Sequence, residues 1–249
     1  MRVPSPLCAA LGVTFEPAFV LSAVGGGGKT SLLLRLGQEA AAAGHTVLYT
    51  TTTQIRQPGP AHMPTVTDGD LSRLRVLLDR DRIACVGIRA GDKLGTPASG
   101  TLAALRGMAH LLLVEADGAK CLPVKAPARH EPVLYPDSSL VVAVAGLRAL
   151  GQPIGACCFR VPQALALLGV REDTQLTPSL LARLLVSDRG GCKGVSSATP
   201  FAVVLNQADD AVLTARGVQT ADCIRGLRPH CRVVVTALRD PDCVKATRT

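Results

Sequence analysis

A strand, a run of glycines and a helix follow one another near the start of the chain, and together they constrain the fold most strongly. Phe19–Val24 is a short, nearly all-apolar stretch that leads into four consecutive glycines, Gly25–Gly28. After Lys29 the leucines Leu32, Leu33 and Leu36 have helical spacing, and Gly44 is a natural helix stop. This order predicts an α/β fold with the glycine turn at the carboxyl end of a buried strand.

The segment Ala23–Thr30 has the order of residues of a Walker A phosphate-binding loop. Glycines allow backbone angles that point successive N–H groups at phosphate oxygens, and the start of the helix adds a positive dipole end. The Lys29 ammonium is predicted to reach the β- and γ-phosphates and the Thr30 hydroxyl to bind Mg²⁺. The predicted nucleotide-binding residues of this loop are Gly25, Gly26, Gly27, Gly28, Lys29, Thr30 and Ser31.

Strands and helices alternate along the rest of the chain. We expect strands at 19–24, 46–50, 82–89, 110–114, 140–145, 201–205 and 232–237. We expect helices at 30–43, 69–80, 101–109, 162–168, 178–186 and 209–226, with Ser99 and Thr177 as caps of two of them. The pattern predicts a P-loop NTPase-like, doubly wound, mainly parallel sheet flanked by helices, in one domain over 1–249 with a helical insertion at 147–199.

Two acidic residues follow the apolar strand at 110–114. Glu115 comes directly after the strand, where a Walker B carboxylate lies, and oxygen ligands of this kind suit Mg²⁺. We therefore expect Glu115 to bind the metal, directly or through water, and Asp117 to orient the attacking water or to couple to the next loop. Lys29, Glu115 and Asp117 are the predicted catalytic residues, and the alternative is two solvated acids at a strand end.

Four threonines, Thr50–Thr53, end the second expected strand. In P-loop folds this position often faces the γ-phosphate, and we take Thr51 and Thr52 as candidates, with Thr52 as a metal ligand. The alternative is that these β-branched residues only end a strand.

A later strand end, Asn206-Gln207-Ala208-Asp209, resembles the N-K-x-D motif with which GTPases read guanine. An Asp there accepts hydrogen bonds from two guanine groups that adenine lacks. Asn206 and Asp209 are therefore candidate nucleotide-binding residues, and Thr236-Ala237-Leu238 resembles a second loop that contacts the same base. Because Gln207 replaces the usual lysine, ATP and GTP both remain open, as does a turn without base contact.

The segment Gly118–Pro132 carries several charges in a loop stiffened by proline. Its candidate residues for a substrate site, a second phosphate clamp or a nucleotide-driven switch are Lys120, Lys125, Arg129, His130 and Glu131. A solvated basic loop is the alternative.

Composition limits the other classes of function. The formal charge is +8, but lysine and arginine are scattered and no tryptophan is present, so we expect no nucleic-acid binding. The nine cysteines are odd in number and irregularly spaced, which argues against a disulfide framework and favours a reducing cytoplasm. We expect no signal peptide and, because no apolar stretch approaches about 20 residues, no membrane partner.

The motifs V-G-G-G-G-K-T, the threonine run, the block from Glu115 to Pro132 and L-N-Q-A-D occur in an order that resembles the YqeC family of selenium-dependent hydroxylase accessory proteins. The block Glu115–Pro132 is the most specific part, whereas Gly26, often Ala in the family, and Cys157-Cys158 depart from it. The resemblance implies a P-loop NTPase that takes part in the maturation of selenium-dependent molybdenum hydroxylases. Its partners would be such a client enzyme or the proteins that mature its cofactor.

The leading hypothesis is therefore hydrolysis of ATP or GTP with Mg²⁺, coupled through the segment 120–131 to a client or cofactor. Two alternatives stay open: a kinase or ligase that acts on a small anionic substrate, and a nucleotide-gated binding module with little hydrolysis. The sequence does not decide the nucleotide, the reaction, the client or the oligomeric state. Nor does it decide whether Cys121 or Cys157-Cys158 has a redox or selenium role.

Overall fold

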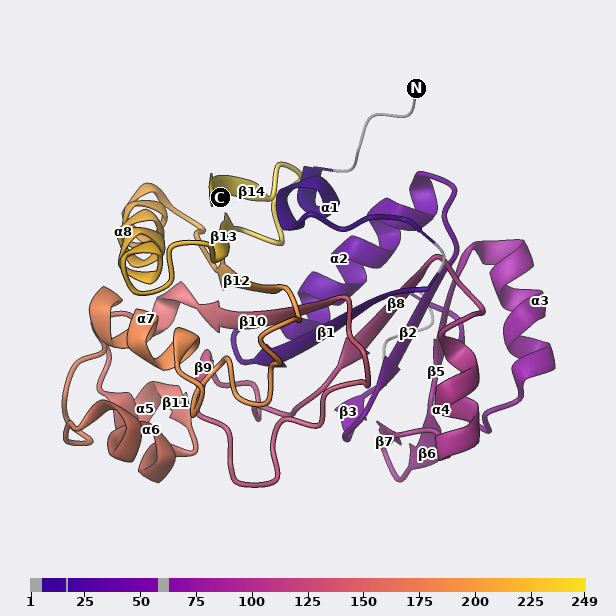
Figure 1. The fold of residues 1–249 in the computed structure, drawn as a ribbon, viewed down its shortest axis with the longest axis horizontal. Helices are drawn as coiled ribbons and strands as arrows, with labels where there is room; N and C mark the ends of the chain where they lie inside the picture. Colours follow the sequence, from indigo (N-terminus) through magenta and orange to yellow (C-terminus); the bar gives the residue numbers. More distant parts are fainter. Residues whose placement is uncertain (1–5, 17, 58–62) are drawn as a thin grey trace. The chain divides into compact units, whose positions relative to one another are not determined.

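The computed structural model describes residues 6–16, 18–57 and 63–249 (Figure 1). The chain divides into two compact units. The first unit consists of the described residues within Met1–Ala23, Thr30–Gly118 and Val133–Leu140. The second contains Val24–Lys29, Ala119–Pro132 and Val141–Thr249. The chain thus passes from one unit to the other within the glycine loop.

The first unit contains five parallel strands in the order β1-β8-β2-β5-β4. They are β1 (Phe19–Gly25, whose last two residues belong to the second unit), β8 (Leu111–Glu115), β2 (Val47–Thr51), β5 (Ile83–Val86) and β4 (Thr65–Val66). The unit's helices are α1 (Pro6–Leu11), α2 (Lys29–Ala42, of which Lys29 belongs to the second unit), α3 (Leu71–Asp81) and α4 (Ser99–Leu105). A small antiparallel sheet of β3 (Ile55–Arg56), β7 (Lys93–Gly95) and β6 (Ile88–Ala90) is added.

Helices cover both faces of these parallel strands, which explains why nearly all of their residues are buried. Helix α2 packs on one face so closely that a Cβ added at Gly37 would lie 2.9 Å from Ile83 Cδ1 and 3.4 Å from Leu113 Cδ1. On the opposite face Leu112 and Val114 pack in one cluster with side chains of α3 and α4. Successive residues of β8 therefore face alternate helical layers.

The second unit contains the strand order β14-β13-β12-β10. Strands β10 (Leu140–Gly146, with Leu140 in the first unit), β12 (Phe201–Asn206) and β13 (Arg232–Thr236) are parallel, and β14 (Val244–Arg248) is antiparallel. The unit also holds the parallel pair β9 (Val124–Lys125) and β11 (Cys158–Phe159). Its helices are η1 (Leu147–Ala149), α5 (Ile154–Cys157), α6 (Val161–Leu168), α7 (Pro178–Val186) and α8 (Ala211–Leu227).

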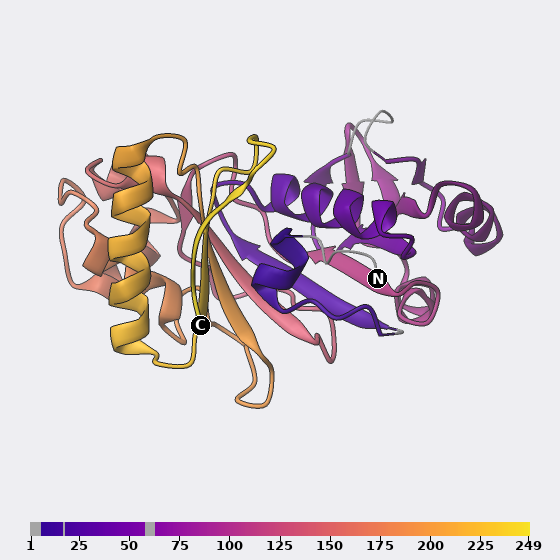
Figure 2. The same cartoon turned by 90° about the horizontal axis from the view of Figure 1, so that it is seen from above.

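Helix α8 lies along β13 and β14 (Figure 2) and contacts α7. Gly217 explains the close approach of α8, since an added Cβ would lie 2.8 Å from Val235 Cγ1 and 2.9 Å from Leu147 Cδ1. Larger side chains at Gly217 would push the helix off the strands.

The fold class has the layout that the sequence predicts, α/β with mainly parallel strands flanked by helices. All seven expected strands are present, but the one expected at 82–89 divides at Gly87 into β5 and β6. The strand at 232–237 is the last of the seven expected strands, but a further strand, β14, follows it in the structure. No helix of the described residues combines the length and the apolar character that crossing a bilayer requires.

Of the two predicted caps, one is confirmed. The Thr177 hydroxyl accepts a hydrogen bond from the Leu180 amide at the start of α7. Ser99 lies inside α4, whose cap position is Ala98, without a side-chain hydrogen bond. The short helix α4 therefore begins without the cap that the sequence predicts.

Candidate functional site

The glycine loop has a backbone that other residues would not fit. Gly25, Gly27 and Gly28 have φ angles of +96°, +71° and +127°, in the region that favours glycine. A Cβ at Gly25 would lie 2.4 Å from the Val144 carbonyl oxygen, and one at Gly27 would lie 2.1 Å from the Gly146 nitrogen. The run of glycines is thus required both by dihedral angle and by the close approach of β10.

Protein carbonyls accept hydrogen bonds from two amides of this loop. The Gly26 amide donates to the Val144 carbonyl at 2.9 Å, and the Gly27 amide donates to the Leu122 carbonyl at 3.1 Å. A phosphate bound by the Gly27 amide would compete with Leu122, which lies in the segment 119–132. The Gly27–Leu122 hydrogen bond therefore connects the glycine loop to that segment within the second unit.

Lys29 is 4% exposed, and its ammonium donates to the Gly25 carbonyl at 2.5 Å. This bond folds the side chain back over the loop. Lys29 is also the first residue of α2, and Gly28 before it has no side chain with which to cap the helix. The first amides of an α-helix lack intrahelical acceptors, so this helix start suits an anion.

Asn206, at the end of β12, is buried and joins two loops of the second unit. Its side-chain nitrogen donates to the Gly27 carbonyl at 2.8 Å. Its side-chain oxygen accepts from the Thr236 hydroxyl and the Leu238 amide, each at 3.2 Å. The structure thus places Asn206 as a support for the glycine loop, with its amide group engaged by protein atoms.

Glu115 is the centre of a polar cluster in the first unit. Its carboxylate oxygen Oε2 accepts hydrogen bonds from the Thr30 hydroxyl and the Tyr49 hydroxyl, both at 2.8 Å. Burial raises the pKa of Tyr49 well above its usual value and the charge on Glu115 raises it further, so the phenol stays a donor. The structure thus brings together Thr30 and Glu115, two of the candidate metal ligands, and adds Tyr49, which the sequence analysis does not identify.

The threonine run ties the end of β2 to its surroundings. The Thr51 hydroxyl donates to the Glu115 carbonyl at 2.8 Å, and the Thr52 hydroxyl donates to the Val133 carbonyl at 2.5 Å. The Thr52 amide also donates to the Glu115 carbonyl at 3.2 Å. The backbone bond therefore holds Thr52 beside Glu115. Asp117, two residues after Glu115 in the chain, is also buried.

A cavity of about 480 Å³ lies in the second unit where the chain leaves β12 and β13, lined among others by Asp209, Ala237 and Lys245. The two base-reading candidates, the loops after Asn206 and after Thr236, thus share one hollow. The Asp209 carboxylate accepts from Arg148 Nη2 at 2.7 Å, and both side chains are partly exposed. A base that approached Asp209 would share the carboxylate with Arg148.

The segment 119–132 is held by charged groups of the second unit. Glu131 pairs with the buried Lys125 at 3.1 Å and with Arg160 at 3.2 Å. The Lys193 ammonium donates to the carbonyl oxygens of Ala128, Arg129 and Glu131 at 2.5, 2.9 and 2.7 Å. Lys125 and Glu131 are therefore engaged inside the protein, and this turn is held from several sides.

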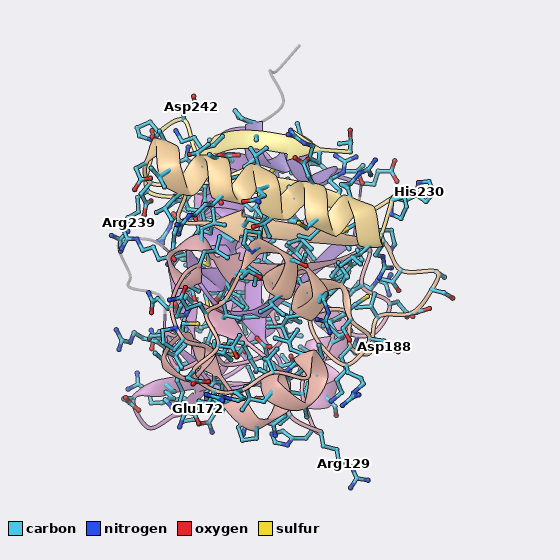
Figure 3. All side chains as sticks on the ribbon, turned by 90° about the vertical axis from the view of Figure 1, so that its left-hand side faces the viewer. Arg129, Glu172, Asp188, His230, Arg239 and Asp242 are labelled. Carbon is cyan, nitrogen blue, oxygen red and sulfur yellow. The ribbon has the colours of Figure 1, made fainter. Side chains whose placement is uncertain are left out.

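The other charged residues of the segment reach the surface. Lys120, Arg129 and His130 are exposed, and Figure 3 shows the Arg129 side chain pointing away from the molecule. Cys121 is the exposed member of the nine cysteines, all of which are free thiols. Ser31, on the first turn of α2, is also exposed.

Glu131 gives a pH-dependent contribution to stability. Burial alone would raise the pKa of its carboxyl, but hydrogen bonds from the Ala128 amide, Arg160 and Lys125 outweigh burial and lower the pKa to about 2, from 4.5. The carboxylate therefore stabilises the fold fully above pH 4.5, and that stabilisation is lost as the pH falls toward 2.

Denaturant unfolding of wild type and Glu131→Gln between pH 7 and pH 2 checks this. We expect the wild type to lose more stability than the variant over the acidic window, while Glu172→Gln, at an exposed carboxyl, behaves as wild type. An acid loss in Glu131→Gln equal to that of wild type would contradict the assignment.

The residues present fit a nucleotide with its magnesium ion. A hydroxyl and a carboxylate oxygen, from Thr30 and Glu115, meet at 2.8 Å, and such hard oxygen donors suit Mg²⁺. The glycine loop leaves room for no side chain at Gly25 or Gly27, as a loop whose backbone approaches phosphates requires. Among the described residues, no group of three or more His, Cys, Asp and Glu side chains could hold a metal ion.

Comparisons with known proteins bear on this site. The YqeC protein family model matches residues 21–162, which include the glycine loop, Glu115 and the segment 119–132. A protein of Escherichia coli (strain K12), described as uncharacterized protein YqeC, is 35% identical over 198 residues, which cover 77% of each chain. The structure of a GTPase in apo form from Pyrococcus abyssi is 14% identical, with a TM-score of 0.38 over 90% of this chain and 92% of that one, a likeness that supports no argument about function. With the family model and the bacterial relative in agreement, this chain belongs to the YqeC family.

Proposed function

We propose that this protein binds and hydrolyses ATP or GTP with Mg²⁺, as a cytoplasmic accessory factor in the maturation of selenium-dependent molybdenum hydroxylases. The observation that carries the proposal is the Thr30–Glu115 hydrogen bond, since Thr30 directly follows the loop lysine in the chain. Family membership supports the maturation pathway through the accessory role that the resemblance implies.

The residues of the proposed site would have different roles. The amides at the start of α2 and the Lys29 ammonium would bind the phosphates, and Thr30 and Glu115 would hold Mg²⁺. Bound Mg²⁺ would supply positive charge that stabilises the oxygens of the transferring phosphoryl group. Asp117 is the candidate to orient the attacking water, and Thr52, at the end of β2, is the candidate for a further metal ligand.

The segment 119–132 is the element that would report the nucleotide to a client enzyme or its cofactor-maturation proteins. The Gly27 amide bonds the Leu122 carbonyl, so phosphate binding at that amide would release Leu122. Arg129 and His130, exposed in the same segment, would then present the change to a partner. Hydrolysis assays on purified protein, with each purine triphosphate and with Mg²⁺ or a chelator, test the proposal. Folded protein that neither binds nor hydrolyses a triphosphate would refute it.

The Asp209→Ala variant tests whether Asp209 distinguishes guanine from adenine. If Asp209 accepts hydrogen bonds from guanine, we expect the variant to bind GTP about tenfold more weakly and ATP within about twofold of wild type. Competition between ATP and GTP in both proteins measures this, with Asp188→Ala as the control at an exposed acid. Equal affinities of variant and wild type for both nucleotides would show that Asp209 does not read the base.

A further inference from the structure

A group of cations surrounds one aromatic ring in the second unit, outside the glycine loop. Arg160 Cζ lies 4.8 Å from the centroid of the Phe159 ring, Lys120 Nζ 5.4 Å and Lys125 Nζ 5.7 Å. Glu131 pairs with Lys125 and Arg160, while Lys120 has no carboxylate partner among the described residues. We call Lys120, Phe159 and Arg160 the cation site.

The fold assembles this site from segments far apart in the sequence. Strands β9 and β11 pair in parallel with Lys125 opposite Phe159, which brings residues 124–125 beside 158–159. Arg160 follows directly, and Lys120 stands before β9. Both Lys120 and Arg160 have positive φ angles, 46° and 70°. Such angles are uncommon outside glycine and cost of order 1 kcal/mol or more each, so the surrounding structure must hold these cations in place.

The three cations around the Phe159 ring differ in their exposure to solvent. The Lys125 side chain is fully buried, the Arg160 side chain is 31% exposed, and Lys120 is exposed. Arg160 uses its Nε and Nη2 on Glu131, which leaves further N–H groups of its guanidinium for another acceptor. Lys120 and Arg160 can thus donate to a ligand from solvent while Lys125 adds positive charge behind them.

Two further features make the potential here positive. Lys193 binds three neutral carbonyls of the adjoining turn and brings another ammonium without a carboxylate partner in the described part of the chain. Helix α6 begins at Val161, next to Arg160, without a side-chain cap. Its N-terminal dipole end has the same sign as the cations.

We propose that the cation site binds a second ligand, a small oxyanion such as a phosphorylated or carboxylated molecule, separately from the nucleotide. An oxyanion between Lys120 and Arg160 relieves the repulsion of the cations and accepts charge-assisted hydrogen bonds from both. The site adjoins the segment whose Leu122 carbonyl bonds the glycine loop, so an anion held there is placed to sense or to use the nucleotide. The ligand class goes beyond the proposed hydrolysis and is the one that a kinase or ligase would need.

Calorimetric titration with inorganic pyrophosphate and with citrate tests the proposal, and the two probes distinguish a phosphorylated from a carboxylated ligand. The titrations use the Lys29→Ala protein, so that the glycine loop contributes little to the binding of either anion. We expect at least one probe to bind, and we expect Lys120→Ala in that background to weaken it about tenfold. Lys120→Glu should weaken it further, because it reverses the charge.

Lys93→Ala, at another exposed lysine, is the matched control and should bind as the parent protein does. Arg160→Gln provides a second variant, with thermal unfolding to confirm that the loss of the Glu131 pair leaves the protein folded. Absence of binding by both probes in the Lys29→Ala protein, or equal affinity with and without Lys120, would overturn the proposal. If wild type binds oxyanions in this way but no triphosphate, the proposed hydrolysis fails while the cation site stands.

Discussion

Lys29→Ala is expected to lower kcat/KM for triphosphate hydrolysis on the order of 10³-fold. The side chain is buried and its ammonium lies on the loop carbonyl of Gly25, so it is already positioned where the negative charge of the phosphates would arrive. Removal of the ammonium leaves the developing charge of the transferring phosphoryl group without its fixed neutralising partner.

The measurement is steady-state hydrolysis of ATP and GTP by wild type, Lys29→Ala and the control Lys93→Ala. Thermal unfolding of each protein without nucleotide shows whether the fold survives, since Lys29 also bonds the loop backbone. If Lys29→Ala is folded and turns over triphosphate as fast as wild type, then the glycine loop is not the nucleotide site.

The glycine loop shows how far local sequence can predict a site. Four successive glycines before a lysine predict a backbone closed to side chains, and the contacts that a Cβ would make at Gly25 and Gly27 have that form. What closes on those glycines, the carbonyl of Val144 and the backbone of Gly146, comes from a strand more than a hundred residues later. Periodicity predicts that strand and its burial, but not which loop its carbonyls meet.

The partners of charged residues are the part that sequence patterns miss. Within the segment 119–132 the acid Glu131 and the base Lys125 could be identified as candidates, and they do pair. Arg160 and Lys193, which bind the same turn, lie 29 and 62 residues from Glu131 in the chain, and no local pattern indicates them. Their roles follow from the pairing of β9 with β11 and from the turn after α7.

For Asn206 the sequence motif predicts the position in the fold, but it does not predict the protein contacts of the side chain. Its place at the end of β12 is as predicted, and the motif suggests a residue near the nucleotide base. In the structure its amide bonds to Gly27, Thr236 and Leu238. A buried amide of this kind fixes the relative position of two loops, so its effect on a nucleotide would pass through the loop backbone.

Glu115→Gln is expected to lower kcat about 10²-fold and to raise the Mg²⁺ concentration needed for half-maximal activity. Glutamine keeps the size of the side chain and one acceptor oxygen but removes the negative charge that a divalent ion requires. The phenol of Tyr49 and the hydroxyl of Thr30 can still bond to the amide oxygen, so the fold should persist. Tyr49→Phe is the matched control, because it removes one hydrogen bond to Glu115 and leaves the carboxylate in place.

For Tyr49→Phe we expect a loss of about 1 kcal/mol in unfolding free energy and an Mg²⁺ requirement close to that of wild type. The two variants distinguish the charge of Glu115 from the hydrogen bond that Tyr49 donates to it. If the Mg²⁺ titration shifts in Glu115→Gln but not in Tyr49→Phe, the metal is assigned to the Glu115 carboxylate. An equal shift in both variants would mean that Glu115 acts by packing and hydrogen bonding. If neither shifts and Asp117→Asn does, the metal ligand is the second acid, since Asp117 is buried two residues further along the same chain segment. Comparison of the Mg²⁺ titrations of the three variants therefore identifies the carboxylate that binds the metal.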